Sequence, residues 1–219
     1  GEARNLDVFA SDLLKPARAA LPITSEFERL SQATEQRRRS ARAGVIKAIS
    51  STHYTEALLA LLRWFDSEDW YGAGSLGETL RAPVHVLAPA LLDRCRAKAE
   101  ARAKDFAKQS AKKRHQLRIA LKKLRYAAEL FAGLYDPAAA KQFIQRLKRL
   151  QDDLGDANDV AVAGDIVQSL APSRRATGAA HAGKRMLDWH KRRIEDNEPK
   201  LRRHLQELLD AQSFWHAAI

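Results

Sequence analysis

The segment of residues 114–131 has one face that must be buried and one that must meet water or anions. If the segment is helical, its apolar side chains fall within about 80° of one another, and its basic side chains fall within about 80° on the far side. The apolar set is Leu117, Leu121, Leu124, Ala128 and Phe131, and the basic set is His115, Arg118, Lys122 and Arg125. We therefore predict an amphipathic helix that packs against a core and presents a row of cations.

The row of cations is spaced for a linear anion. Its positions project along roughly 15 Å of helix axis, which suits several phosphates in series rather than one. The stretch from Arg94 to Arg125 contains 13 Lys or Arg residues against Glu100 and Asp105, so it carries the whole formal net charge of +11. A positive field concentrated in this way attracts polyanions.

The remaining sequence predicts an all-α protein. Charged residues make up 30% of the chain, and no run alternates apolar and polar residues for more than a few positions. No apolar stretch approaches the ~20 residues that span a bilayer, so we expect a soluble protein without membrane contacts. A single cysteine, Cys95, excludes an internal disulfide and offers no paired thiolates for zinc. The expected compartment is the cytoplasm.

Helical spacing and terminal signals divide the chain into a series of expected helices. Pro16 is expected to end or kink the first helix, a capping box at residues 25–28 to begin the second, and Gly155 to close a later one. Ser110 and Asp136 are the expected N-caps of two further helices. The helices are expected over residues 3–14, 25–49, 53–65, 84–108, 111–131, 137–154, 156–170 and 179–196, with a last one after Pro199.

The helix expected over residues 84–108 carries a basic face of its own. Arg94, Lys98 and Arg102 recur at i, i+4 and i+8, so they lie on one side of that helix. We expect these three cations to support the basic row from the preceding helix. Lys98 is not counted among the residues that contact phosphate directly, and no arginine contact is assigned at its position.

Two arginines of the second expected helix are hard to place as solvent-facing charges. Arg38 lies inside the apolar stripe of residues 25–49, and Arg42 lies at its margin. Either they point into a wet interior that holds anions, or their stems pack while their charged heads reach the surface. The sequence leaves both interpretations open.

A short internal echo predicts a repeat. The eight residues from Gly1 match the eight from Gly155 in a glycine, an acid, an alanine, a polar residue, an Asx residue and a final valine. His115 precedes Gly155 by 40 residues, so an equivalent helix would precede Gly1. The chain is therefore expected to begin inside the first of two repeats.

Two sequence motifs stand out. The first comprises His115, Arg118, Lys122, Lys123, Arg125 and Tyr126, in the pattern His-x-x-Arg-x-x-x-Lys/Arg-Lys/Arg-x-Arg-Tyr. The second comprises Leu147, Leu150, Gln151, Leu154, Gly155, Asn158 and Asp159, in the pattern Leu-x-x-Leu-Gln-x-x-Leu-Gly-x-x-Asn-Asp. The two motifs together, in order, are far more specific than either alone. They resemble those of a known family, the conserved-histidine α-helical domain, or CHAD.

The resemblance implies two pseudo-symmetric antiparallel four-helix bundles, with basic residues of both halves lining a groove that binds inorganic polyphosphate. Residues 1–80 would be the remainder of a first repeat, truncated at its N-terminus, and residues 81–219 the second repeat. The family's members occur alone, associated with polyphosphate granules, or fused behind a triphosphate-handling CYTH domain. The first signature helix is missing here. The family's arrangements make a CYTH domain fused upstream a further expectation.

The candidate polyphosphate-binding residues are cationic side chains and one histidine. They are His115, Arg118, Lys122, Arg125, Lys123, Arg114, Lys148, Lys141, Arg42 and Arg38. Arginine forks can bridge two phosphate oxygens, whereas lysines add point charge. His115 is expected to contact phosphate, with packing or general-base roles as alternatives. The scattered histidines show no HExxH or similar pair, so we expect no metal and no cofactor.

Three functions remain in view. The first is non-catalytic binding of inorganic polyphosphate or another polyanion. The second is enzymatic, as a phosphohydrolase or the regulatory part of an inorganic triphosphatase, although the sequence shows no carboxylate cluster for the divalent metal. The third is nucleic-acid binding through the basic patch, against which no aromatic residues interleave with the row as base-stacking platforms.

Overall fold

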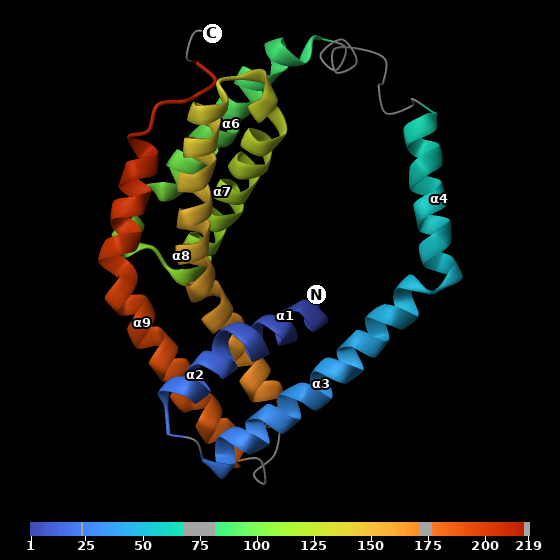
Figure 1. Cartoon of the computed structure of the whole chain (residues 1–219), viewed down its shortest axis with the longest axis vertical. Coiled ribbons are helices and arrows are strands. Elements are labelled where there is room, and N and C mark those ends of the chain that lie inside the picture. The colour runs from blue at the N-terminus through green and yellow to red at the C-terminus, as the bar shows by residue number, and fades with distance from the viewer. Residues whose placement is uncertain (23, 68–81, 171–176, 217–219) are drawn as a thin grey trace. The chain divides into compact units, whose positions relative to one another are not determined.

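The structure, a computed structural model, describes residues 1–22, 24–67, 82–170 and 177–216, and all regular structure in these ranges is helical. The all-α prediction is confirmed for this part of the chain (Figure 1). The chain divides into two compact units. Unit 1 comprises Gly1–Leu80 and Asp159–Arg192, and unit 2 comprises Arg81–Asn158 and Arg193–Ile219. The pseudo-symmetry of two repeats, and their division at residue 80, stay predictions.

Unit 1 packs the N-terminal helices against a long helix and against parts of two later ones. Its elements are α1 (Glu2–Val8), the π-helix η1 (Phe9–Leu14), α2 (Lys15–Ala20), α3 (Ser25–Ile49), α4 (Thr52–Asp66), the end of α8 (Pro137–Leu170) and the start of α9 (Thr177–Leu209). Phe9 and Phe27 are fully buried, as is Met186 of α9. A side chain at Gly183 would lie 2.4 Å from Val167, so the glycine permits close approach of α9 to α8.

The chain stays helical across Pro16, with a change of helix type just before it. The π-helical segment η1 ends at Leu14, and α2 begins at Lys15, so the missing N–H of the proline falls in the first turn of α2. One local prediction in unit 1 was wrong, because the expected capping box at residues 25–28 does not form. Thr24 is the N-cap of α3, and no side chain caps this helix.

The second half of α3 and the whole of α4 have little cover from the described residues. The predicted apolar stripe of α3 is buried at Phe27 and Leu30, but Val45 and Ile49 are exposed. In α4 the large apolar side chains, from Tyr54 to Phe65, are between 44% and 63% exposed. Despite this apolar surface, none of the described helices combines the length and the hydrophobicity needed to span a membrane.

Unit 2 is built from helical segments around one core. Its elements are α6 (Val84–Ala103), the 3-10 helix η3 (Phe106–Lys108), α7 (Ala111–Phe131), the 3-10 helix η4 (Ala132–Leu134), the first part of α8 and the last part of α9. Its core joins Leu92 of α6, Leu121 of α7, Leu147 of α8 and Leu205 of α9. Adjacent helices of this unit run antiparallel (Figure 1).

The two helices that carry the motifs begin where the sequence predicts. The hydroxyl oxygen of Ser110 accepts a hydrogen bond from the backbone N–H of Lys113 at 3.4 Å. The carboxylate of Asp136 accepts one from the N–H of Ala139 at 2.7 Å, just before Pro137. Both caps satisfy donors that the first turn of a helix leaves without partners.

The helix ends predicted at Gly155 and Pro199 are absent. α8 runs without a break from Pro137 to Leu170, and α9 continues through Pro199 to Leu209. An added side chain at Gly155 would meet nothing within 4 Å, so packing does not explain this glycine. The expected connection before α9 lies largely outside the described residues.

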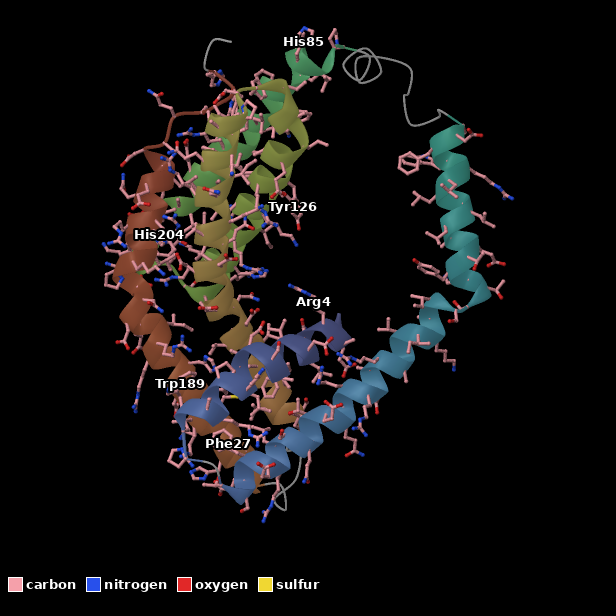
Figure 2. All side chains as sticks on the ribbon, viewed as in Figure 1. Arg4, Phe27, His85, Tyr126, Trp189 and His204 are labelled. Carbon is pink, nitrogen blue, oxygen red and sulfur yellow. The ribbon has the colours of Figure 1, made fainter. Side chains whose placement is uncertain are left out.

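Side chains also hold α8 in register against its neighbours in unit 2. The amide Nε2 of Gln151 donates a hydrogen bond to the backbone carbonyl of Leu121 in α7 at 3.0 Å. On the α9 side, Nδ1 of His204 lies 2.5 Å from a carboxylate oxygen of Asp153 (His204 is labelled in Figure 2). The first bond fixes α8 beside α7, where the candidate site lies, and the second joins α8 to α9.

Candidate anion-binding site

The amphipathic character predicted for residues 114–131 is confirmed in α7. Leu117, Leu121 and Leu124 are buried in the core of unit 2. The cationic face is accessible to different degrees, because His115 and Lys122 are exposed whereas Arg118 and Arg125 are half-buried. We call the four residues His115, Arg118, Lys122 and Arg125 the α7 row.

The two arginines of the α7 row are poorly paired. Nε of Arg118 and Nε of Arg125 are both buried and have no hydrogen-bond partner among the described residues. In the same ranges, the only carboxylate within ion-pair distance of either one is that of Glu129, whose oxygen lies 4.0 Å from Nε of Arg125. Buried donors without partners are costly, and charged ones more so. Apart from this carboxylate, no internal acid in the described ranges compensates the charge of the two half-buried guanidinium groups, so that charge is available to an external anion.

Tyr126 brings two cations of the row together without neutralising them. Nζ of Lys122 lies 5.4 Å from the centre of its ring, and Cζ of Arg125 lies 5.0 Å from it. The negative face of an aromatic ring attracts cations and offsets part of their mutual repulsion. Tyr126 (labelled in Figure 2) thus supports the row, a role that the motif alone did not reveal. Its spacing of four residues from Lys122 is the signal that predicts the first of these contacts, whereas a neighbour at one residue, such as Arg125, would not be expected to face it.

His115 is held by a residue of the second motif. Its Nδ1 lies 2.7 Å from Oδ1 of Asn158 in α8. Because an amide oxygen only accepts, Nδ1 carries the proton of this bond, and the ring is oriented with Nε2 directed away from Asn158. Helical periodicity gives no signal for this contact, because 43 residues separate His115 from Asn158.

Arg114 lies beside the row but is committed to an internal ion pair. Its two terminal nitrogens donate hydrogen bonds of 2.7 Å and 2.8 Å to the two carboxylate oxygens of Glu198 in α9. Its guanidinium group also lies 4.5 Å from the ring centre of Phe106. The hydrogen bonds from Arg114 lower the pKa of the Glu198 carboxyl below its ordinary value. Arg114 therefore joins α7 to α9.

The predicted lysines differ in their surroundings. Nζ of Lys148 lies 3.2 Å from a carboxylate oxygen of Glu129, so its charge is partly compensated. Lys123 and Lys141 are exposed. Lys123 follows Lys122 by one residue and points about 100° away from it around the helix. It therefore projects from α7 in a direction different from that of the row.

The basic face predicted on the preceding helix is present on α6. Arg94, Lys98 and Arg102 all lie within this helix, and all three are exposed. Position 98 holds a lysine and not an arginine, so α6 offers no guanidinium fork there and only a mobile point charge. The support of the α7 row by these three cations stays a prediction.

Arg38 and Arg42 lie in unit 1 and share an acid. Nε of Arg38 lies 2.9 Å from Oδ1 of Asp7, and a terminal nitrogen of Arg42 lies 2.8 Å from the same oxygen. Arg38 also binds Glu35 at 2.7 Å. The hydrogen bond from Arg38 is the main cause that lowers the pKa of Asp7. These arginines have acidic partners, whereas Arg118 has none among the residues that the structure describes, and their role in anion binding stays a prediction.

The chemistry available at the α7 row is the recognition of anions. Guanidinium and ammonium groups supply charge-assisted donors, and His115 adds an imidazole. No group of three or more His, Cys, Asp or Glu side chains that could hold a metal ion is found in the described part of the chain.

Comparisons with known proteins agree with the motifs and the fold. The family model of the CHAD domain matches residues 1–168. The crystal structure of the CHAD domain from the plant Ricinus communis is similar with a TM-score of 0.79 and 24% identity, over 97% of this chain and 68% of that one. Comparison with curated protein sequences gave no match. With both motifs on adjacent helices and a family model that spans most of the sequence, the chain belongs to the CHAD domain family.

Proposed function

We propose that this protein binds inorganic polyphosphate without catalysis, and that the α7 row is its principal contact. The observation that carries the proposal is the state of Arg118 and Arg125, whose half-buried guanidinium groups have buried Nε atoms without hydrogen-bond partners among the described residues. A chain of phosphates offers a repeated oxyanion to each of them in turn. The CHAD resemblance points to the same ligand.

The row favours a linear phosphate over a nucleic acid. Its one adjacent aromatic residue, Tyr126, already carries Lys122 and Arg125 over its ring. Proteins that bind single strands use aromatic faces to stack bases, and such platforms do not alternate with these cations. Polyphosphate has no base to stack and makes all of its contacts through charge.

Calorimetric titration of the chain with long-chain polyphosphate tests the proposal. We expect tight binding that depends on chain length and weakens steeply with salt, because each neutralised phosphate releases counterions. A DNA duplex of equal total charge is the comparison ligand and is expected to bind more weakly. If polyphosphate binds no better than the duplex, the row is a general polyanion surface and the proposal is wrong.

The enzymatic alternative has its own readout. Incubation of the chain with inorganic triphosphate and Mg²⁺, followed by measurement of released phosphate, separates a binding protein from a phosphohydrolase. The proposal expects no release above the background of the buffer. Release of phosphate by the unmodified chain that disappears in a variant of the α7 row would show that the protein is an enzyme and would overturn the proposal.

Asn158 is predicted to act through His115. Asn158→Ala should weaken polyphosphate binding by about fivefold, the value of one modest hydrogen bond, because the imidazole is no longer held. The salt dependence should not change, since no cation is removed. His115→Ala is the control. The double variant should bind like His115→Ala alone. A further loss in the double variant would show that Asn158 acts on something else.

A further inference from the structure

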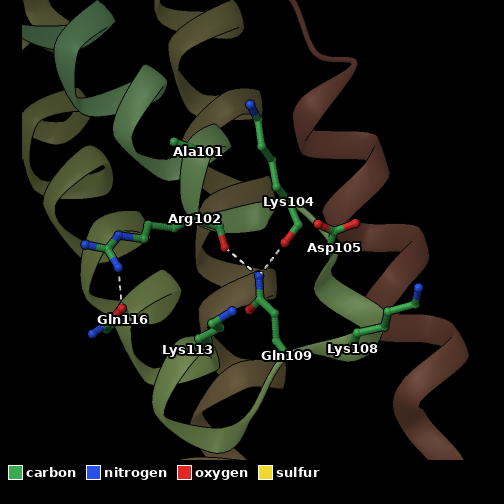
Figure 3. Close-up of a pocket in the computed structure, with 8 residues that line it drawn as sticks. All are labelled: Ala101, Arg102, Lys104, Asp105, Lys108, Gln109, Lys113 and Gln116. Carbon is green, nitrogen blue, oxygen red and sulfur yellow. Dashed lines mark hydrogen bonds between the residues drawn. The ribbon is translucent and has the colours of Figure 1, made fainter.

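A second concentration of positive charge lies at the corner where α6 turns into α7 (Figure 3). A cavity of about 470 Å³ opens there, within unit 2. Four cations line it, Arg102, Lys104, Lys108 and Lys113, against one carboxylate, Asp105. None of the four cations has a carboxylate within ion-pair distance among the described residues. The volume falls in the range of about 300–1,000 Å³ that small-molecule sites occupy, and the charged lining excludes an apolar ligand.

Neutral side chains hold the walls of this corner. The amide of Gln109 donates hydrogen bonds to the backbone carbonyls of Arg102 at 2.7 Å and Lys104 at 2.8 Å, which closes the end of α6 (Figure 3). The guanidinium of Arg102 donates to the amide oxygen of Gln116. Asp105 has a φ of 53°, the only positive value at a non-glycine residue in the described ranges. These polar contacts hold the Arg102 side chain and the backbone of the corner without cancelling any of the positive charge.

The position of these charges on α7 is unfavourable in the absence of an anion. The first turn of α7 contains no acid, and Lys112 and Lys113 stand there instead. The N-terminus of a helix carries partial positive charge and prefers acidic residues. α3 of the same chain follows that preference with Glu26 and Glu28 in its first turn. An anion bound at the corner would offset the repulsion between these lysines and the positive N-terminus of α7.

The corner is separate from the α7 row. Lys113 and Gln116 project from α7 at least about 100° away from the row residues around the helix axis. The buried leucines of α7 lie between the two directions on one side of the helix. A ligand in the corner therefore contacts a different surface from a phosphate chain on the row.

We propose that this corner, lined by Arg102, Lys104, Lys108 and Lys113, is a second anion site that takes a short condensed phosphate. A di- or triphosphate group is compact enough for the cavity and carries several charges to meet several cations. Lysine ammonium groups suit it as mobile point charges, and Arg102 adds a fork for two oxygens. The lining contains no aromatic face for a base, so it would contact only the phosphate group. That group is either a free inorganic anion or the phosphate tail of a nucleotide.

Titration of the full chain with inorganic tripolyphosphate tests this site, in metal-free buffer of low ionic strength. The double variant Lys108→Gln/Lys113→Gln should weaken binding on the order of 30-fold, and Lys104→Gln alone should give a smaller loss in the same direction. The matched control is Lys184→Gln/Lys191→Gln, which removes the same charge from exposed positions of α9 in unit 1. All five lysines are exposed, so folding should persist and circular dichroism checks it.

The row variant keeps this test separate from the proposed function. Arg118→Ala/Lys122→Ala/Arg125→Ala should retain tripolyphosphate binding even where it loses long-chain polyphosphate. ATP distinguishes the source of the ligand. Equal affinity for ATP and tripolyphosphate assigns the site to any triphosphate group, and a preference for tripolyphosphate assigns it to the free anion. If the corner variant binds tripolyphosphate as tightly as the control variant, or if only the row variant loses it, the second site does not exist.

Discussion

Replacement of Arg118, Lys122 and Arg125 together by alanine is expected to lower the affinity for long-chain polyphosphate by on the order of 100-fold or more, because three charge-assisted contacts are lost. The dependence of the binding constant on salt should also become shallower, by about three in a plot of log K against log salt concentration. Titration calorimetry at several salt concentrations measures both quantities.

The fold of this variant should be retained. Of the three residues, only Arg125 has a carboxylate nearby in the described ranges, at 4.0 Å. Removing crowded like charges from one helix face should leave the melting temperature nearly unchanged or raised. The control is Arg63→Ala/Lys191→Ala/Arg192→Ala, which removes the same charge from exposed positions of unit 1. An equal loss of binding in the control would assign binding to net charge, and loss of helicity in the row variant would assign the row a structural role.

Glu198→Gln is expected to destabilise unit 2 by about 2 kcal/mol, because Arg114 keeps its charge but loses a bidentate partner in a confined position. Only 20% of the Arg114 side chain and 18% of the Glu198 side chain are exposed, so water cannot fully replace the bond. Urea denaturation followed by circular dichroism measures the change. Glu195→Gln is the matched control, since Glu195 is an exposed acid on the same helix.

The same pair predicts a dependence of stability on pH. The pKa of Glu198 is lowered in the folded chain, first by its hydrogen bonds with Arg114, from an ordinary value of 4.5. Between the two values the unfolded chain binds more protons than the folded one. The stabilisation is therefore complete above the ordinary value and is lost as the pH falls through the lowered one. Glu198→Gln should flatten this part of the profile, whereas Glu195→Gln should leave it unchanged.

Local signals predicted the fold well where the physical cause is local. Ser110 and Asp136 cap α7 and α8 because a side-chain oxygen reaches the first-turn N–H groups of its own helix. Gly155 and Pro199 led to wrong predictions of helix ends, because their local tendency to end a helix competes with the burial of neighbouring residues. Leu154 and Val160 flank the glycine, Leu201 follows the proline, and all three are buried. Helix continuity there is maintained by tertiary packing that exceeds the local cost, about 1 kcal/mol for a glycine and about 3 kcal/mol for a proline in a helix interior.

The candidate site was predictable in outline and not in its pairings. Helical periodicity placed Arg118, Lys122 and Arg125 on one face of α7, and the structure confirms that the opposite face is buried. The sequence could not show that Arg114 would be paired, because Glu198 is 84 residues away in the chain. A cation in a sequence does not reveal whether its counter-charge is internal. That distinction depends on tertiary contacts.

The hydrogen bond from Gln151 to the backbone of α7 has a consequence for interpreting relatives of this protein. Gln151 belongs to the second motif, yet its amide contacts the carbonyl of Leu121 and so sets the register of two helices. A relative that retains this glutamine but has neutral residues in place of the α7 row would adopt the same architecture without the contacts that we propose for phosphate. Motif matches that rest on the glutamine and the leucines therefore identify a scaffold, and under our proposal only the cations of α7 distinguish members that bind the anion from those that share the architecture alone.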